Sequence, residues 1–332
     1  MINDIKISFI ITVYNIETYV KRCLDSVLMQ NINEKEIIIV DDGSIDSCPD
    51  ICDQYAHKYS NVKVIHKSNG GISSARNLGI YEAHGDYICF VDGDDFYRND
   101  FAENMLNLCY ENDLDIIRGW YSVYEDKSNT FSEHKFPKIS FEGQTLSGHA
   151  FLVKSIKEHA NEVVPWLGFF KRKFLLDNNI LFPEGIAYEE DQLFFLDALL
   201  RDPNCRVLQV NNEFYAYRKH VGSATKTPTI KQIEDVLCIV DEEFKILNKY
   251  DFISKKTKKS AKRYISSSFY QLTSIYGRLT KENRKKINHL ISFCTANKCI
   301  KNSYDLHQKI KIFLFTYCRW FVGLIYDLRG KK

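Results

Sequence analysis

Short apolar segments rich in Val and Ile alternate with helical segments in the first half of the chain, and this alternation limits the possible folds more than any other feature. The apolar segments are continuous, which is typical of strands buried on both faces of a parallel sheet. We therefore predict an α/β fold with a mostly parallel, Rossmann-like sheet and helices on both of its faces. The predicted strands are 6–13, 36–40, 62–65, 87–91 and 114–117, and the predicted helices are 19–28, 51–59, 75–83 and 101–110.

Polar residues follow each of the first four predicted strands, at 12–15, 41–44, 69–77 and 92–95. Any one of these clusters is compatible with an ordinary turn or helix cap, because Asp, Asn, Ser and Gly are the usual residues there. The carboxyl ends of parallel strands meet at one edge of a sheet, and such sheets bind ligands outside that edge. We therefore expect the four clusters to form one binding site.

The residues at this edge indicate the kind of ligand. No G-x-x-x-x-G-K-[ST] loop occurs and no G-x-G-x-x-G follows the first strand, which argues against phosphate-loop and dinucleotide sites. Asp92 and Asp94 instead supply two carboxylates that suit a hard divalent cation such as Mn²⁺ or Mg²⁺. An acidic edge needs that cation to hold an anionic diphosphate, so we predict a nucleotide diphosphate bound through a metal.

The charged residues divide the chain in two. The 45 Lys and Arg and the 43 Asp and Glu give a net charge of only +2, which argues against a nucleic-acid binder with a dominant basic surface. Residues 1–230 carry 23 basic and 34 acidic side chains, a net charge of −11, whereas residues 231–332 carry 22 and 9, a net charge of +13. We therefore predict an acidic body over 1–230 and a basic region over 231–332.

Cysteine usage and the first residues indicate a reducing compartment. None of the ten cysteines lies in a C-x-x-C pair, and several, such as Cys89, lie in apolar runs where Cys behaves as a small hydrophobic residue. The first residues lack the positive region and cleavage site of a signal peptide, and no uncharged apolar run reaches the roughly 20 residues of a membrane-spanning helix. We expect a cytoplasmic protein without disulfides.

The basic region has the apolar spacing of helices. This spacing extends over 233–247, 265–279 and 309–328, and Lys and Arg cluster at 255–263 and 284–286. Basic residues combined with Trp, Phe and Leu are typical of a helix that lies in an anionic membrane interface, which would place the protein peripherally on the inner face of the cell membrane through 252–332. The alternative is a helical subdomain that packs on the core and has solvated lysines.

The four strand-and-cluster segments together resemble inverting family-2 glycosyltransferases of the GT-A fold, of the type that makes bacterial surface polysaccharides. They read Phe9-Ile10-Ile11-Thr12-Val13-Tyr14-Asn15, Ile37-Ile38-Ile39-Val40-Asp41-Asp42-Gly43-Ser44-Ile45-Asp46, Asn69-Gly70-Gly71 with Ala75-Arg76-Asn77-Leu78-Gly79, and Gly85-Asp86-Tyr87-Ile88-Cys89-Phe90-Val91-Asp92-Gly93-Asp94-Asp95. A looser resemblance continues through 166–170, 182–185, 188–194 and 215–218. The resemblance implies a nucleotide-diphosphosugar-transferase fold over 1–230, with a nucleotide-binding half at 1–118 and an acceptor half at 119–230, followed by a C-terminal helical region over 231–332.

The resemblance assigns the nucleotide to the first three clusters. Asp42 would accept a hydrogen bond from the imide of a uracil ring, and Tyr14 would stack on that ring with Thr12 lining the pocket. Arg76 would approach the diphosphate or the base, although a guanidinium there equally suits a pair with Asp42 or Asp92.

The resemblance assigns the metal to the fourth cluster. Asp92 is expected near the ribose and the metal, and Asp94 directly on the metal. Many relatives carry Ser where this chain has Gly93, a spacer that is expected to leave the metal pair intact. Asp95 is expected to cap the helix that follows.

By the same resemblance, Asp191 is the base that takes the proton of the acceptor hydroxyl. The hydroxyl would attack the anomeric carbon opposite the leaving diphosphate, so that the configuration inverts. Glu190 is the alternative base, because Glu189, Glu190 and Asp191 are adjacent acids. Acids also favour the first turn of a helix, so these residues equally suit a helix start.

Two single residues have both a functional and a structural interpretation. His220 would touch the diphosphate or complete the metal shell, although a lone His is more often structural or exposed. Trp166 would form a platform for a sugar ring, although a Trp buried in the core is more common.

These expectations combine into one prediction. The chain is predicted to be a metal-dependent, inverting glycosyltransferase that moves a hexose from a UDP-linked sugar to a hydroxyl of a growing, lipid-linked surface glycan of the capsule or O-antigen kind. The alternative is a catalytically inactive subunit that binds nucleotide or glycan in a polysaccharide assembly complex. The intact acids at 42, 92, 94 and 191 favour the enzyme.

Overall fold

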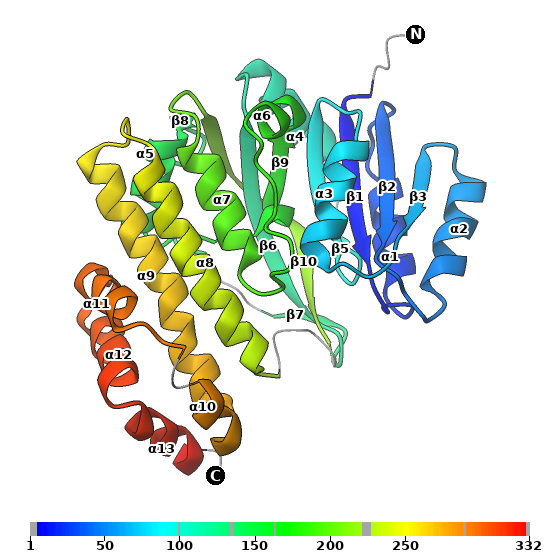
Figure 1. Ribbon diagram of the computed structural model, residues 1–332. Coiled ribbons are helices and arrows are strands. Elements are labelled where there is room, and N and C mark those ends of the chain that lie inside the picture. Colours follow the sequence, from blue (N-terminus) through cyan, green and yellow to red (C-terminus); the bar gives the residue numbers. More distant parts are fainter. Residues whose placement is uncertain are drawn as a thin grey trace.

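The computed structural model describes residues 5–98, 100–132, 136–162, 164–220, 227–287 and 290–329. Residues 1–4, on which the expectation about a signal peptide rests, lie outside this part of the chain. In the described residues, ten strands form one sheet in the order β3-β2-β1-β4-β9-β6-β10-β5, with β7 paired to β6 and β8 paired to β10 (Figure 1). The strands are β1 (Ile7–Val13), β2 (Lys35–Asp41), β3 (Val62–His66), β4 (Tyr87–Asp92), β5 (Phe96–Tyr97), β6 (Ile116–Glu125), β7 (Thr130–Ser132), β8 (Leu146–Ser147), β9 (Gly168–Lys171) and β10 (Arg206–Lys219).

The five predicted strands are present, and the prediction of a mostly parallel sheet holds for part of it. β3, β2, β1 and β4 pair in parallel, as do β6 and β10. β9 lies antiparallel to both of its neighbours, β4 and β6, so the sheet as a whole is mixed. Glycine is required where β9 enters, because a Cβ atom on Gly168 would lie 1.8 Å from the carbonyl oxygen of Ile117.

Helices cover both faces of the sheet and create two cores. One face is covered by α1 (Val20–Leu28), α2 (Cys48–Lys58) and α4 (Ala102–Glu111), and the other by α3 (Ile72–Glu82), α5 (Gly148–Lys157), α6 (Arg172–Asp177) and α7 (Glu190–Leu200). β1 shows why the strands are apolar throughout: Phe9 and Ile11 face one core, Ile10 faces the other, and all three are fully buried. Cys89, on β4, is buried as predicted.

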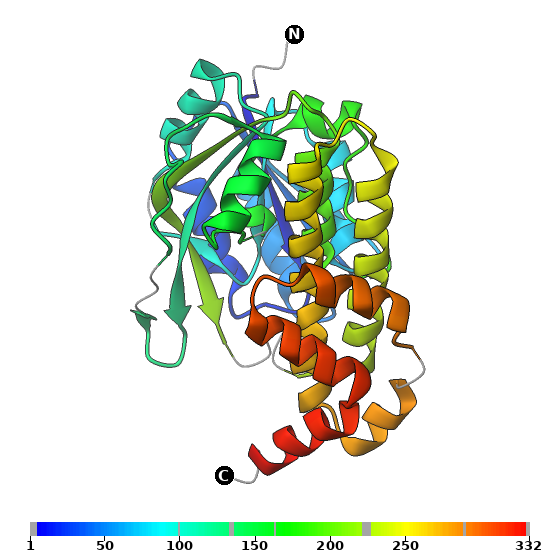
Figure 2. The ribbon, with the colours of Figure 1, turned by 90° about the vertical axis from the view of Figure 1, so that its left-hand side faces the viewer.

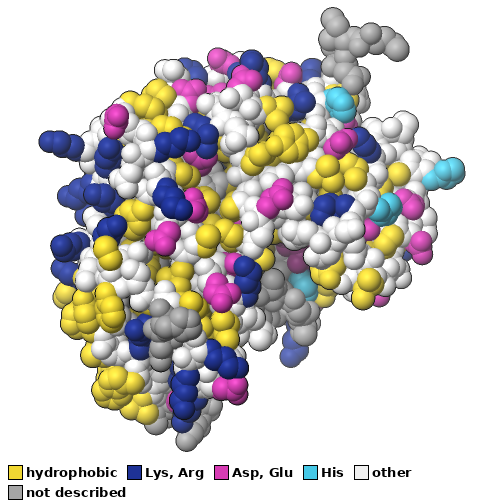
Figure 3. Space-filling view, viewed as in Figure 1, with side chains coloured by type: hydrophobic (Ala, Val, Ile, Leu, Met, Phe, Trp, Pro, Cys, Tyr) yellow, Lys and Arg dark blue, Asp and Glu magenta, His cyan; other side chains and the backbone are white. Residues whose placement is uncertain are grey.

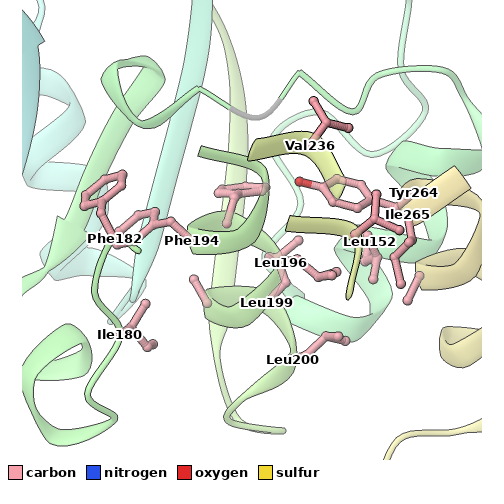
Figure 4. Close-up of a cluster of buried hydrophobic side chains, with 14 of the residues drawn as sticks. Leu152, Ile180, Phe182, Phe194, Leu196, Leu199, Leu200, Val236, Tyr264 and Ile265 are labelled. Atoms are coloured by element: carbon pink, nitrogen blue, oxygen red, sulfur yellow. The ribbon is translucent and has the colours of Figure 1, made fainter. Parts of the chain in front are cut away.

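The basic region continues the second core. α8 (Ile230–Lys249) and α9 (Lys255–Arg278) pack beside α7 and α5, and Figure 4 shows Val236, Tyr264 and Ile265 clustered with Leu152 and Leu196. The alternative of a packed helical region is therefore correct for these two helices. The remaining helices, α10 (Lys281–Ile287), α11 (Phe293–Asn302), α12 (Leu306–Tyr317) and α13 (Arg319–Arg329), lie around the far end of α9 (Figure 2).

Two features of this region differ from the prediction or limit it. The single helix predicted over 309–328 is two helices, because the backbone leaves the helical conformation at Cys318, with φ −131° and ψ 42°. None of the helices in the described part of the chain combines the length and apolarity needed to cross a bilayer.

Candidate active site

The carboxyl ends of the central strands bring the predicted clusters to one edge of the sheet. Thr12 lies opposite Asp92 in the parallel pairing of β1 and β4. The amino end of α7 and the carboxyl end of β10 reach the same edge, where Asp191 and His220 contact residues that follow β3 and β4. Residues from five separate parts of the sequence thus converge where the strand pattern predicted a ligand site.

Arg76 is the centre of this arrangement. Its guanidinium pairs with three carboxylates: Asp92 at 2.9 Å, Glu190 at 3.1 Å and Asp191 at 2.7 Å. Burial lowers the pKa of Arg76, and its three partners more than offset this, so that the pKa lies above its ordinary value. Of the partners considered for Arg76, the structure shows Asp92, and it adds both candidate bases.

The metal residues predicted in the fourth cluster face different partners. Asp92 faces Arg76, whereas Oδ2 of Asp94 lies 2.9 Å from Nε2 of His220. Burial raises the pKa of Asp92, the charge of Arg76 lowers it and the charge of Asp94 raises it, with a net shift upward. Among the described residues, no group of three His, Cys, Asp or Glu side chains is arranged to hold a metal ion by itself.

The spacer between the two aspartates has no room for a side chain. A Cβ atom on Gly93 would lie 2.8 Å from the carbonyl oxygen of Thr12 and 2.6 Å from Cδ1 of Ile16. The amide of Gly93 also donates to that same Thr12 carbonyl, at 3.0 Å. The glycine that departs from the family pattern is therefore fitted to this chain's own β1–β4 junction.

Asp95 joins the end of β4 to β10 and does not cap a helix, which corrects the prediction. It is buried, and it accepts hydrogen bonds from Oη of Tyr215 at 2.9 Å and from the amide of Arg218 at 2.7 Å. α4 begins seven residues later, at Ala102, and its N-cap residue Phe101 makes no side-chain cap hydrogen bond. Because Arg218 precedes His220 by two residues, Asp95 helps to bring His220 to Asp94.

Trp166 belongs to the core that supports this junction. Its ring stacks on Tyr215 with a centroid distance of 4.2 Å, and only 5% of the residue is exposed. A sugar platform needs an accessible ring face, and Trp166 lacks one in this structure. The more common structural interpretation of a buried Trp is the one the structure supports.

The predicted uracil pocket is bounded by a carboxylate that already has partners. Asp42 is buried, and it accepts hydrogen bonds from the amides of Gly70 at 2.9 Å and Gly71 at 2.8 Å, and from Nζ of Lys67 at 2.6 Å. Sequence reasoning missed Lys67, although it stands two residues before the glycine-rich cluster. Tyr14, after β1, is half-exposed (49%), so one face of its ring is accessible for stacking.

The candidate bases lie at the amino end of α7, and the alternative of a helix start is correct for the same residues. Glu190 and Asp191 form the first turn of α7, and Glu189 is its N-cap residue. Burial and the neighbouring charge of Glu190 raise the pKa of Asp191, and Arg76 opposes this rise. Its side chain remains 19% exposed, so the carboxylate stays accessible to an acceptor.

Glu189→Gln is expected to raise the free energy of unfolding near pH 8 by up to about 3 kcal/mol. Burial raises the pKa of Glu189 from 4.5 to about 7. The folded state therefore binds this proton more tightly than the unfolded state. The resulting stabilisation is full below pH 4.5 and is lost as the pH rises through 7. Urea unfolding measured across this pH range should show that the free energy of unfolding falls more steeply with pH in the wild type than in Glu189→Gln. The same pH dependence in both proteins would contradict the raised pKa of Glu189.

The fold and the site define the class of protein. A parallel half of the sheet with Asp92 and Asp94 at the end of β4, together with Glu190 and Asp191 at the start of α7, is the arrangement expected of a GT-A glycosyltransferase. The family model described as "Glycosyl transferase family 2" matches residues 8–180, and the chain belongs to this family.

Known proteins resemble the chain at the levels of sequence and fold. It is 28% identical to the "Uncharacterized glycosyltransferase EpsJ" of Bacillus subtilis, over 98% of this chain and 96% of EpsJ. It is 35% identical to the "Poly(ribitol-phosphate) beta-glucosyltransferase" of Bacillus spizizenii, over 64% of this chain and 32% of that protein. The crystal structure of S. aureus TarS 1–349 matches with a TM-score of 0.66 and 22% identity, over 90% of this chain and 81% of that one. A further TarS 1–349 structure contains UDP-GlcNAc and has a TM-score of 0.62.

Proposed function

We propose that the protein is a metal-dependent, inverting glycosyltransferase that moves a hexose from a UDP-sugar to a hydroxyl of a growing, lipid-linked surface glycan. The observation that carries the proposal is the convergence of Arg76, Asp92 and Asp191 at the carboxyl edge of the sheet. This arrangement puts a candidate base next to the residues that would hold the donor. The UDP-GlcNAc complex of TarS, which has the same fold, supports the choice of donor.

In the proposed reaction, Asp191 accepts the proton of the acceptor hydroxyl as the oxygen attacks the anomeric carbon. Its carboxylate lies at the edge of a buried ion-pair group and is still reachable from outside, which suits a base that must meet a second substrate. Attack on the face opposite the diphosphate inverts the anomeric configuration. Arg76, which already carries its positive charge at this edge, would stabilise the negative charge that grows on the departing UDP.

Asp94 and His220 would hold the Mn²⁺ or Mg²⁺ ion, with Asp92 beside them. Their contacting atoms are a carboxylate oxygen, which suits both metals, and an imidazole nitrogen, which suits transition metals better than Mg²⁺, and the two atoms lie 2.9 Å apart. Mg²⁺ and Mn²⁺ usually complete their coordination shells with substrate phosphates and water, so two or three protein ligands are enough. When bound, the cation supplies positive charge to the diphosphate.

Asp94→Ala is expected to weaken UDP binding in the presence of Mn²⁺ by more than about 10-fold, and to leave the metal-independent part of binding unchanged. The carboxylate that would hold the metal is lost, while the predicted uracil contacts at Asp42 and Tyr14 remain. Calorimetric titration with UDP, with and without Mn²⁺, measures both parts. Asp53→Ala removes an exposed carboxylate on α2 and serves as the control. An undiminished Mn²⁺ effect in Asp94→Ala would contradict the metal assignment.

The proposed acceptor is a membrane-bound glycan, and the surface of the C-terminal helices supports this part of the proposal. We define the C-terminal apolar patch as the exposed hydrophobic residues of α11 to α13, namely Phe293, Leu306, Ile310, Phe313, Tyr317, Trp320, Phe321 and Leu324. On α12 these side chains recur at helical spacing and face outward, whereas Ile312 and Phe315 face the core. Figure 3 shows hydrophobic side chains gathered at the lower left, with Lys and Arg above them.

The charge around the patch fits an anionic bilayer. Residues 252–332 carry 19 Lys and Arg and only 3 Asp and Glu, a net charge of +16. Exposed Trp and Phe beside basic residues are the composition of interfacial membrane helices. α13 also lies toward the same end of the molecule as the carboxyl ends of β1 and β6, so a bilayer at the patch would be on the side of the active site (Figures 1 and 2).

The double variant Phe313→Ser and Trp320→Ser is expected to reduce binding to phosphatidylglycerol-rich vesicles by at least about 10-fold, because each side chain loses the free energy of burying its apolar surface. Co-flotation with vesicles measures this, and added salt should weaken wild-type binding as well. Tyr81→Ser, which removes an exposed ring from α3, is the matched control. Equal flotation of all three proteins would leave the patch without a membrane role. Point variants suit this test better than truncation at 230, because α8 and α9 belong to the core.

A further inference from the structure

The segment that carries the candidate bases is held in an unfavourable backbone conformation. We call residues 185–192 the base segment. Glu189 has φ 66° and ψ 15°, the left-handed region that a residue with a side chain rarely adopts, and it stands directly before Glu190 and Asp191. Such a conformation persists only where the surrounding structure holds it, and it is found most often at functional sites. The contacts around the base segment therefore determine where Asp191 points.

α8 holds the first part of the base segment. Oδ2 of Asp235 accepts a hydrogen bond from the amide of Ala187 at 3.2 Å. Nζ of Lys231 donates to the carbonyl of Gly185 at 3.1 Å and pairs with Oδ1 of Asp235 at 2.7 Å. Asp235 is 2% exposed whereas Lys231 is 58% exposed, so the carboxylate is the buried member of the pair, and these two donors stand in place of water around it.

α9 holds the end of the base segment. Oη of Tyr264 donates to the carbonyl oxygen of Gln192 at 2.8 Å, one residue beyond Asp191. Tyr264 is 1% exposed and lies in the apolar core, where a phenolic hydroxyl needs a partner. In Figure 4 its ring lies between α7 and the C-terminal helices, which shows how α9 reaches this backbone. The opposite side of the base segment is contacted by Ser73 of α3, whose Oγ donates to the carbonyl of Ile186 at 3.2 Å.

α8 also carries a buried acid, Glu243, whose pKa depends on the charge of Glu189 in the base segment. Glu243 of α8 is fully buried and accepts a hydrogen bond from Ser268 of α9 at 3.4 Å. Burial raises the pKa of Glu243, and the charge of Glu189 raises it further. Glu243 and Glu189 each have one buried oxygen, Oε2, without a hydrogen-bond partner.

From these contacts we infer that α8 and α9 position the catalytic base. Asp235 on α8 and Tyr264 on α9 are the positioning residues. The inference rests on the proposed role of Asp191. The predicted donor residues lie on β1, β4 and α3 and in the loops that follow β1, β2 and β4, whereas Asp235 and Tyr264 lie on α8 and α9, so neither is expected to touch the donor. Loss of either contact should therefore misplace Asp191 and reduce kcat, while the KM for the nucleotide sugar stays nearly the same.

The test compares Asp235→Ala and Tyr264→Phe with Tyr270→Phe in the full-length protein. Tyr270 is on the same helix as Tyr264, and its hydroxyl accepts a hydrogen bond from Lys311 at 3.0 Å, away from the base segment. Hydrogen exchange is read for amides of residues 185–193, together with the melting temperature, UDP affinity, kcat and donor KM. We expect exchange of these amides to become at least about 5-fold faster in the first two variants only, with kcat at least about 5-fold lower and UDP affinity unchanged.

Two results would overturn the inference: unchanged exchange in the base segment, or faster exchange throughout the protein, which would indicate general destabilisation. Faster exchange confined to residues 185–193 in a protein that transfers no sugar would support the positioning contacts and count against the proposed function. The exchange measurement thus separates the two ideas.

Discussion

Asp191→Asn is expected to lower the rate of sugar transfer by about 10²–10⁴-fold and to leave the affinity for UDP unchanged. The amide has the same shape as the carboxylate and cannot accept the proton of the acceptor hydroxyl. Arg76 keeps its contacts with Asp92 and Glu190 in this variant, so the surrounding structure should persist. Initial rates with saturating donor, together with UDP titration, measure the two parts of the prediction.

Glu190→Gln is the matched control, because Glu190 is the alternative base and contacts the same guanidinium group. If Asp191→Asn were fully active and Glu190→Gln inactive, Glu190 and not Asp191 would be the base. The pH dependence gives a second check. Because burial raises the pKa of Asp191, the wild-type rate should increase with pH over a range above the ordinary titration of aspartate, and this limb should be absent from the residual activity of Asp191→Asn.

Arg76→Met is expected to lower the free energy of unfolding at neutral pH by about 3–5 kcal/mol, the usual cost of removing one partner from a buried ion pair. The methionine fills similar space but leaves Asp92, Glu190 and Asp191 facing one another without a cation. The loss should shrink in acid, where these carboxyls take up protons. Urea unfolding at neutral and acidic pH measures both effects.

Arg98→Met is the comparison for this prediction. Its guanidinium pairs with Glu213 at 3.4 Å, and both side chains are about as exposed as ordinary surface groups, at 35% and 45%. An exposed pair of this kind contributes about 1 kcal/mol or less. If the free energy of unfolding fell no further in Arg76→Met than in Arg98→Met, the pairing of Arg76 with its three carboxylates would not contribute to stability.

The fold of the first half is predictable from the sequence because three of its strands, β1, β2 and β4, are buried on both faces over most of their length. β1 requires an uninterrupted apolar run, and Phe9, Ile10 and Ile11 provide it. β9 has only four residues, Gly168–Lys171, too few for a pattern, and its position between β4 and β6 depends on pairing with distant strands. The break at Cys318 was equally invisible, since the apolar spacing continues through it.

The candidate site was predictable as a set of clusters but not as a set of contacts. His220 was expected at the diphosphate, in the metal shell or in a structural role, and its contact with Asp94 depends on Asp95, which was predicted to cap a helix. Arg76 was expected near the diphosphate or one carboxylate, and three-way pairing depends on α7 lying against α3. Side-chain partners across long sequence separations follow from tertiary packing, which local patterns do not encode.

The same limit explains the C-terminal helices. The apolar residues that recur at helical spacing in 233–247 and 265–279 face the core, a choice that periodicity left open between a packed subdomain and a membrane-facing helix. On α12, Ile310, Phe313 and Tyr317 face solvent and Leu314 is partly buried, while Ile312 and Phe315 fill the core. A helix that is apolar on two faces does not reveal which face packs inward. The sequence therefore could not tell which apolar side chains would be buried and which would form the exposed patch that we propose contacts the membrane.

The most direct test of the proposed function is UDP release by the purified, full-length protein from a panel of UDP-hexoses, with Mn²⁺ and with lipid-linked glycan as acceptor. We expect UDP to be released from one donor. This release should depend on both Mn²⁺ and the acceptor and should be lost in Asp191→Asn. UDP-dependent thermal stabilisation without any turnover would favour the inactive binding subunit. Release of UDP from none of the donors, together with no stabilisation by UDP, would contradict the assignment of this site to nucleotide-sugar chemistry.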